Sequence, residues 1–193
     1  MKISHLAAVS ALAVAVSLGA YATPGFAQMK QNEPTVTVGG APMYPSKNIV
    51  ENAVNSKDHT TLVAAVKAAG LLETLQGAGP FTVFAPTNDA FKKLPAGTVE
   101  TLVKPESKAM LTKILTYHVV AGKMSAKDLM DAAKKGGGKA MLKTVAGESL
   151  TVEAQGSSLI ITDAKGGKSK VTIQNVNQSN GVIHVVDTVL MPA

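Results

Sequence analysis

The sequence predicts an α+β domain, because helical and β patterns occupy different parts of the chain. Between residues 48 and 135, apolar side chains recur at the three- and four-residue spacing of amphipathic helices. From Gly136 onward, short runs rich in β-branched residues alternate with glycine-containing turns. The chain has 193 residues and no internal repeat, so we expect a single domain.

The segment from Gly79 to Phe91 is expected to form the nucleus of the fold. Its sequence, GPFTVFAPTNDAF, holds three of the four phenylalanines of the chain. The apolar run between Pro80 and Pro86 indicates a buried strand, and Thr87 is placed to cap a following helix. Each fully buried Phe or Val contributes roughly 1.5–3 kcal/mol to stability. The segment is therefore predicted to be structural and not a chemical site.

Further helices are predicted on both sides of this nucleus. Thr60 is expected to cap a helical segment that Gly70 divides in two, and Pro105 suits the first position of a later helix. Ser125 and Asp128 have the spacing of a capping box, which would begin another helix. The apolar faces of these helices are expected to hold Leu62, Val63, Val66, Leu72, Leu75, Met110, Leu111, Ile114 and Leu115.

The second half of the chain predicts a series of short strands. Asn180 and Gly181 precede the last of them, and this dipeptide favours a turn with a positive φ at Gly181. The predicted strands are Tyr117–Val120, Met141–Val145, Ser149–Ala154, Leu159–Thr162, Lys170–Val176 and Val182–Met191.

Residues 1–27 are predicted to be a secretory signal peptide. Lys2 precedes an apolar run, and small residues lead to a cleavage point between Ala27 and Gln28. The alternative is a retained membrane anchor, for which the run is short. Residues 28–45 are predicted to be an N-terminal strap or linker with one short edge strand. We therefore expect a secreted or periplasmic protein with no integral membrane span after processing.

The composition excludes some classes of function. The chain has no cysteine, so packing alone must stabilise it, and no lipid-modified N-terminal cysteine is available. Its net charge is +6, and every basic side chain is a lysine. Nucleic-acid binding is not expected, because recognition of phosphate and guanine usually uses the planar fork of arginine. The lysines form either an ordinary solvated surface or a surface that attracts acidic polymers and anionic lipid headgroups.

No catalytic, metal or cofactor site is predicted. The sequence shows no nucleophile with a base and an orienting group, which argues against an enzyme. His59, His118 and His184 stand alone, with no second metal ligand two to four residues away. His59 is expected at the surface or at a helix cap. Met110, Met130 and Met141 lie in apolar patterns, so core filling accounts for them better than copper binding does.

Three stretches resemble the signatures of the fasciclin domain. They are PFTVFAPTNDAF, ILTYHVVAGKMSAKDL and SNGVIHVVDTVLMP, and the resemblance covers residues 46–192. It implies a fasciclin-like fold, in which an antiparallel β-sandwich carries several short helices on one side and end. It also implies a non-enzymatic binding module. For His118 and His184, it implies buried imidazoles that order backbone groups.

The resemblance also suggests a partner-binding set, comprising Tyr117, His118, Asn175 and Val176. In animal fasciclin domains, a Tyr-His stretch and an Asp-Ile pair before the last strand are associated with cell adhesion. Tyr117 and His118 match the first of these, whereas Asn175 stands where the acidic residue would be. Integrin-type recognition is therefore not expected, because such receptors favour a carboxylate. We expect Tyr117 and the segment from Asn175 to Ser179 to lie on or near one surface.

Two functions follow as alternatives. The first is an exported, monomeric adhesion module that recognises a cell-surface, envelope or extracellular-matrix component, whether polysaccharide, protein or lipid headgroup. The second is a binding protein for small apolar ligands or lipid headgroups, which would use a groove between helices and sheet. Binding through lysines should weaken with salt, whereas binding in an apolar groove should respond little.

Overall fold

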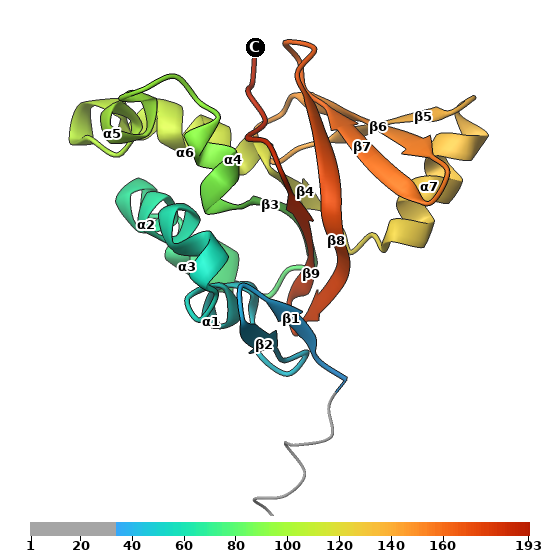
Figure 1. Cartoon of the computed structure of the whole chain (residues 1–193), viewed down its shortest axis with the longest axis horizontal. Coiled ribbons are helices and arrows are strands. Elements are labelled where there is room, and N and C mark those ends of the chain that lie inside the picture. Colours follow the sequence, from blue (N-terminus) through green and yellow to red (C-terminus); the bar gives the residue numbers. More distant parts are fainter. Residues whose placement is uncertain (1–33) are drawn as a thin grey trace, which may run out of the picture. The chain divides into compact units, whose positions relative to one another are not determined.

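The computed structural model describes residues 34–193. Seven strands form one strongly curved sheet in the order β4-β3-β9-β8-β7-β6-β5 (Figure 1). All neighbouring strands are antiparallel except β3 and β9, which run parallel. The strands are β3 (Phe81–Pro86), β4 (Val119–Ala121), β5 (Lys139–Lys143), β6 (Ser149–Gln155), β7 (Ser158–Thr162), β8 (Lys168–Gln178) and β9 (Gly181–Val186).

The two outer strands of this sheet approach each other. Val120 and Thr144 form an isolated antiparallel bridge, and the Val145 amide donates to the Val119 carbonyl at 2.8 Å. The sheet therefore curls nearly into a barrel. The predicted α+β class and fasciclin-like fold are confirmed, but one continuous sheet takes the place of two separate layers.

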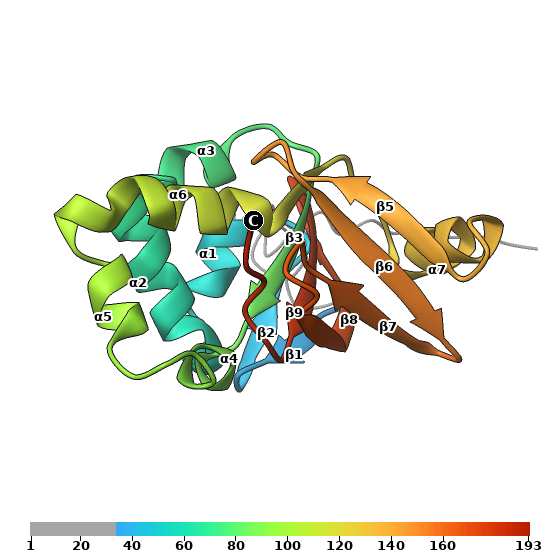
Figure 2. The ribbon, with the colours of Figure 1, turned by 90° about the horizontal axis from the view of Figure 1, so that it is seen from above.

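Most helices gather on one side of the sheet, and α7 lies at the opposite end beside β5 and β6 (Figure 2). A small hairpin of β1 and β2 precedes them. The remaining elements are β1 (Val36–Val38), β2 (Ala41–Met43), α1 (Ile49–Ala53), α2 (Thr60–Ala69), α3 (Leu72–Gln76), α4 (Asn88–Lys92), α5 (Thr98–Leu102), α6 (Lys108–Tyr117) and α7 (Ala126–Lys135), with 3₁₀ turns at Lys57–His59 and Pro105–Ser107. Within residues 34–193, no helix has the length and apolar character needed to span a membrane.

Several predicted helix boundaries are confirmed. The Thr87 hydroxyl accepts from the Ala90 amide at 3.2 Å and so begins α4. Ser125 and Asp128 form the predicted capping box of α7. Gly70 ends α2 in the left-handed conformation, with φ of 74°. These features depend only on neighbours in the sequence, which explains why the sequence pattern is sufficient to predict them.

The predicted cap of α2 is wrong. Thr60 is the first residue of the helix, and the residue before it, His59, makes no capping hydrogen bond with its side chain. Instead, the Asn88 side-chain oxygen accepts from the Thr61 amide at 3.0 Å and from the Thr60 hydroxyl at 3.1 Å. The start of α2 is therefore satisfied by a residue of α4, which a local sequence pattern does not reveal.

Two methionines predicted in the core are exposed. Met110 on α6 and Met141 on β5 are 60% and 75% exposed. The strand prediction at Tyr117 also differs, because Tyr117 is the last residue of α6 and β4 begins at Val119.

Two hydrophobic clusters stabilise the fold. The first lies between the helices and strands β3, β4 and β9, and includes Ile114 and Ile183. The second lies inside the curled sheet next to α7, and includes Leu129, Leu150 and Ile161. The first cluster also contains Val38 and Met43 of the β1–β2 hairpin, which belong to the predicted strap. Residues 1–33, which include the predicted signal peptide and its cleavage point, lie outside the described residues.

Candidate functional site

The predicted partner-binding set begins where α6 ends and β4 begins. Tyr117 is fully buried in the second cluster, and its hydroxyl donates to the Ser149 carbonyl at 3.1 Å and accepts from the Ala164 amide at 2.9 Å. Burial raises the pKa of this phenol. The expectation that Tyr117 lies at a surface is wrong, because its ring fills the interior of the curled sheet.

His118 is also buried, and both of its ring nitrogens have backbone partners. Nδ1 lies 2.8 Å from the Ile114 carbonyl of α6, and Nε2 accepts from the Leu190 amide at 3.0 Å. This pairing requires a neutral ring with its proton on Nδ1. Burial lowers the pKa of His118 to about 4. The imidazole therefore joins helix α6 to the C-terminal segment, which is the backbone-ordering role that the resemblance implied.

His184 has the same kind of role on β9. Its Nε2 lies 2.9 Å from the Met124 carbonyl, and burial lowers the pKa of the ring. The imidazole stacks on Phe84, its neighbour in the parallel β3–β9 pair, with ring centroids 5.8 Å apart. The Met124 contact joins the central strands to the loop that leads into α7.

The other half of the predicted set lies at an irregularity in β8. The pairing of β8 with β9 shifts register between Ile173 and Val176, and Asn175 there has φ of 58°. This conformation directs the Asn175 side-chain oxygen to the Ala126 amide, at 2.7 Å, at the start of α7. Val176 is buried, whereas Asn175 is exposed. Of the four predicted residues, Asn175 alone presents its side chain to solvent.

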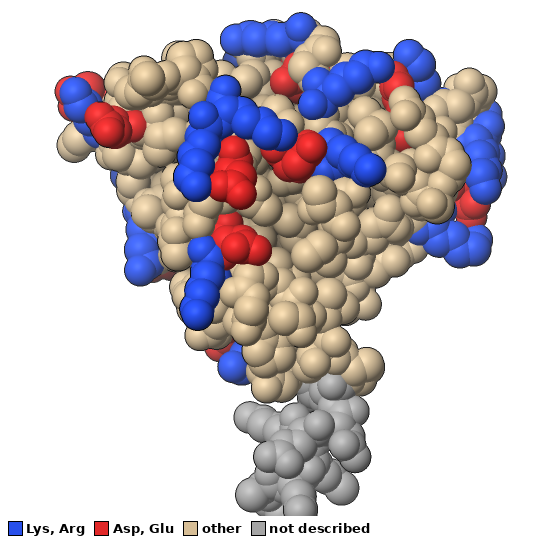
Figure 3. Space-filling view, in the orientation of Figure 1, with Lys and Arg blue, Asp and Glu red and all other residues tan. Residues whose placement is uncertain are grey.

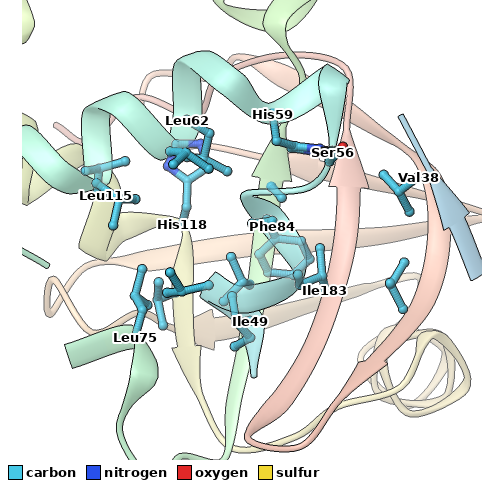
Figure 4. Close-up of a pocket in the computed structure, with 18 of the residues that line it drawn as sticks. Val38, Ile49, Ser56, His59, Leu62, Leu75, Phe84, Leu115, His118 and Ile183 are labelled. Atoms are coloured by element: carbon cyan, nitrogen blue, oxygen red, sulfur yellow. Dashed lines mark hydrogen bonds between the residues drawn. The ribbon is translucent and has the colours of Figure 1, made fainter. Parts of the chain in front are cut away.

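An apolar cavity of about 50 Å³ lies on the helical side of the sheet (Figure 4). Its walls come from helices α1, α2 and α3 and from strands β3 and β9, and His118 and Val176 contribute to its lining. Nearly all of the lining is aliphatic or aromatic. The polar side chains at its wall are Ser56, His59 and His118.

His59 corrects a second expectation, because it lies in the interior and not at the surface. It is 3% exposed, and its Nδ1 lies 2.9 Å from the Ser56 hydroxyl. Burial lowers the pKa of His59, while interaction with the Ala85 backbone raises it. Its Nε2 has no partner with hydrogen-bond geometry. A polar residue next to a helix start predicts exposure, and only the 3₁₀ turn before α2 directs this ring inward.

Asp163 and Asn180 connect separate segments through hydrogen bonds, which the sequence did not predict. Asp163 accepts from the Gly167 amide at 2.7 Å and, with its second oxygen, from the Met191 amide at 2.9 Å. Asn180 donates to the Leu75 and Gly77 carbonyls at 2.7 and 2.9 Å. Their partners at Met191, Leu75 and Gly77 are distant in sequence, so no local pattern identifies these contacts.

Most polar side chains of this region are engaged within the protein. His118 and His184 are occupied by backbone groups, and the described residues contain no cluster of His, Asp and Glu side chains that could hold a metal ion. Asn175, the exposed lysines and the apolar cavity are the candidate contacts for a partner or ligand.

The Fasciclin domain model matches residues 57–192. This chain belongs to the fasciclin domain family.

Several relatives of this fasciclin domain match it over most of their length. Protein sll1483 of Synechocystis is 45% identical over 170 residues, covering 88% of this chain and 87% of that protein. The immunogenic protein MPB70 of Mycobacterium bovis is 38% identical over 197 residues, covering 96% and 92%. The cell surface glycolipoprotein MPB83 of the same species is 35% identical over 175 residues, covering 87% and 70%.

A solved structure supports the fold. The FAS1 domain pair from the insect cell adhesion molecule fasciclin I matches with a TM-score of 0.68 and 19% sequence identity. The match covers 83% of this chain and 58% of that one. At this identity the similarity concerns the fold alone.

Proposed function

We propose that this fasciclin domain is an exported, non-enzymatic adhesion module that binds a component of the cell surface, envelope or matrix. The observation that carries the proposal is its similarity, over most of its length, to a cell surface glycolipoprotein, MPB83. The fold match to a domain pair from an insect cell adhesion molecule points in the same direction.

The internal use of the polar residues supports a binding role over catalysis. The polar atoms of Tyr117, His118 and His184 form hydrogen bonds with backbone groups. These bonds hold strands, helices and the C-terminal segment together. A catalytic base must be free to reach a substrate proton. In this proposal, binding therefore depends on exposed groups, and the buried hydrogen bonds hold the elements that carry them in place.

Asn175 is the accessible member of the predicted partner-binding set. Its side-chain oxygen is held by the Ala126 amide, which leaves its Nδ2 group available at the surface as a donor. Tyr117, His118 and Val176 lie in the interior, and in this proposal they support the surface and do not touch the partner.

The charged surface offers a second means of attachment. Lysines and acidic side chains are interspersed on the face seen in Figure 3, and pairs such as Lys113–Glu148 and Lys127–Asp131 neutralise part of the charge. The surplus of lysine leaves a net attraction for acidic polymers, which salt should screen.

The test is a pull-down of the purified protein against isolated envelope and matrix fractions at low and high salt. We expect retention that falls as salt rises. The Asn175→Asp variant keeps the oxygen that accepts from Ala126 and loses the free donor, so it should remain folded and bind several-fold more weakly.

The matched control is Gln155→Glu, which makes the same change of charge on an exposed side chain of β6. It should bind as the wild type does. If Asn175→Asp and Gln155→Glu lose binding equally, charge and not this position is responsible. Absence of retention by any fraction at low salt would contradict the proposal as a whole.

A further inference from the structure

The apolar cavity beside α1, α2 and α3 contains one polar atom without a partner. His59 lines the cavity and is 3% exposed, and its Nε2 has no hydrogen-bond partner. Leaving a buried polar group unpaired costs stability, and such groups in native structures require an explanation. Turning the ring would not relieve this, because the Ser56 hydroxyl holds Nδ1 at 2.9 Å. The Ala85 backbone lies close enough to influence the ring, but it does not reach Nε2 with hydrogen-bond geometry.

Water is a poor occupant for this cavity. A buried water molecule needs two to four polar partners. Apart from Ser56, His59 and His118, the side chains that line this cavity are aliphatic or aromatic, among them Val66, Val83 and Phe84. A molecule with one hydrogen-bonding group on an apolar body matches this lining better, since its apolar part contacts the walls and its polar group meets Nε2.

The hydrogen-bonding group that fits is a hydroxyl. Either Nδ1 donates to the Ser56 hydroxyl, which makes Nε2 an acceptor, or the hydroxyl donates to Nδ1, which makes Nε2 a donor. A hydroxyl both donates and accepts, so it satisfies Nε2 in both cases. An ammonium or carboxylate does not fit, because burying a charge among apolar walls is costly.

The size of the cavity limits what can be enclosed. Its volume of about 50 Å³ holds a few non-hydrogen atoms, since an apolar cavity of about 150 Å³ holds benzene. The partly exposed lining residues Ala53, Val63 and Leu72 come from α1, α2 and α3, so the cavity approaches the surface between these helices. A chain longer than the cavity can therefore extend outward from it.

The geometry points to a binding site for an aliphatic alcohol, with the hydroxyl on His59 Nε2 and the carbon chain directed toward the gap between α1, α2 and α3. The same chemistry is offered by a free short-chain alcohol and by the hydroxyl end of a long-chain alcohol. This site is independent of the surface around Asn175.

The test is an NMR titration of the protein with 1-butanol and with pentane, which has the same number of non-hydrogen atoms and no hydroxyl. We expect 1-butanol to shift the amide signals of the cavity lining and the ring nitrogen signal of His59. Its affinity should exceed that of pentane about tenfold, the equivalent of one hydrogen bond. Butylammonium should not bind.

Titration with 1-decanol distinguishes the two sources. Tighter binding than that of 1-butanol indicates a long-chain alcohol whose tail lies along the gap, whereas equal or weaker binding indicates a free short-chain ligand. Either result supports the site, provided that the same amide signals shift.

Two variants test the placement of the ligand. His59→Phe replaces the imidazole with an apolar ring of similar shape, and it should abolish the preference for 1-butanol over pentane. Val66→Phe should fill the cavity and abolish binding of both, while Val103→Phe adds the same group at an exposed position outside the lining and should change nothing.

Three outcomes would overturn the inference. They are a wild-type protein that binds 1-butanol no better than pentane, a His59→Phe variant that keeps the preference, and a folded Val66→Phe variant that still binds. Should Val66→Phe not fold, the His59→Phe comparison decides the matter alone.

Discussion

At the scale of single residues, buried polar side chains connect segments that are far apart in the sequence. Asn180 is an example, because its side chain bonds the Leu75 and Gly77 carbonyls and accepts from the Ile49 amide at 3.0 Å. Three backbone groups of the helical region thus depend on one amide at the start of β9.

Replacing Asn180 with Asp should destabilise the protein strongly, although the two side chains are nearly the same size. The carboxylate can accept from Ile49, but it cannot donate to the two carbonyls and would repel them. We expect a loss of about 2–4 kcal/mol, since buried groups left unpaired cost roughly 1–3 kcal/mol each. Chemical denaturation measures it. Asn177→Asp, on an exposed neighbour, should stay within about 0.5 kcal/mol of wild type, and similar losses for both would refute the role of Asn180.

Gly181 is required for close approach and not for its backbone conformation. The positive φ predicted from the Asn180-Gly181 pair is absent, and the residue with left-handed φ in this region is Asn175. A Cβ at Gly181 would overlap the Phe81 carbonyl oxygen in the parallel β3–β9 pair.

Gly181→Ala should therefore separate β3 from β9 and cost about 1–3 kcal/mol or more, as overpacking does. Gly156→Ala is the matched control, because Gly156 has φ of 61° but open space around it. That variant should cost only about 1 kcal/mol from its backbone conformation. If thermal melting shows the control to be the more destabilised of the two, steric approach is not the reason for Gly181.

At the scale of elements, the irregularity in β8 positions the start of α7. The register shift places Asn175 in the left-handed region, and its side chain accepts from Ala126 at 2.7 Å. Strand and helix are thus fixed by one residue that is also the accessible member of the predicted partner-binding set.

Substitutions at Asn175 should separate the contribution of its hydrogen bond to Ala126 from that of its left-handed backbone conformation. Asn175→Gly keeps the backbone conformation and loses the bond to Ala126, which should cost about 1 kcal/mol. Asn175→Ala loses both and should cost roughly 1 kcal/mol more. Urea denaturation compares the two, and equal losses would mean that the left-handed conformation of Asn175 carries no measurable strain.

At the scale of the whole molecule, buried neutral imidazoles make stability depend on pH. Burial lowers the pKa of His59, His118 and His184, and that of His118 falls to about 4. The unfolded chain, with histidine pKa near 6.5, then binds more protons than the folded protein in the range between these values. The stabilising contribution is fully present above pH 6.5 and is lost as pH falls toward 4.

The free energy of unfolding should therefore decrease between pH 6.5 and 4, by about 3 kcal/mol for His118 alone. Denaturation at several pH values measures this decrease. The His118→Gln variant should have a lower free energy of unfolding at neutral pH, and that free energy should decrease less steeply as the pH falls. The decrease that remains belongs to His59, His184 and the carboxylates. A variant with an unchanged slope would show that His118 does not titrate differently on folding.

Features that depend on near neighbours in the chain could be predicted from the sequence. The caps at Thr87 and Ser125, the end of α2 at Gly70 and the order of helices and strands follow from local hydrogen bonds and from the periodicity of apolar residues. The three signature stretches indicated the family and, with it, the fold and the structural role of His118 and His184.

Which polar groups are accessible depends on tertiary contacts and could not be predicted from the sequence. Tyr117 and His59 look accessible in the sequence, yet distant backbone groups and aliphatic walls surround them. The parallel pairing of β3 with β9 likewise sets the need for Gly181. For Tyr117 and Gly181 the deciding partner lies tens of residues away, and a contact of that kind exists only after folding has brought the two segments together.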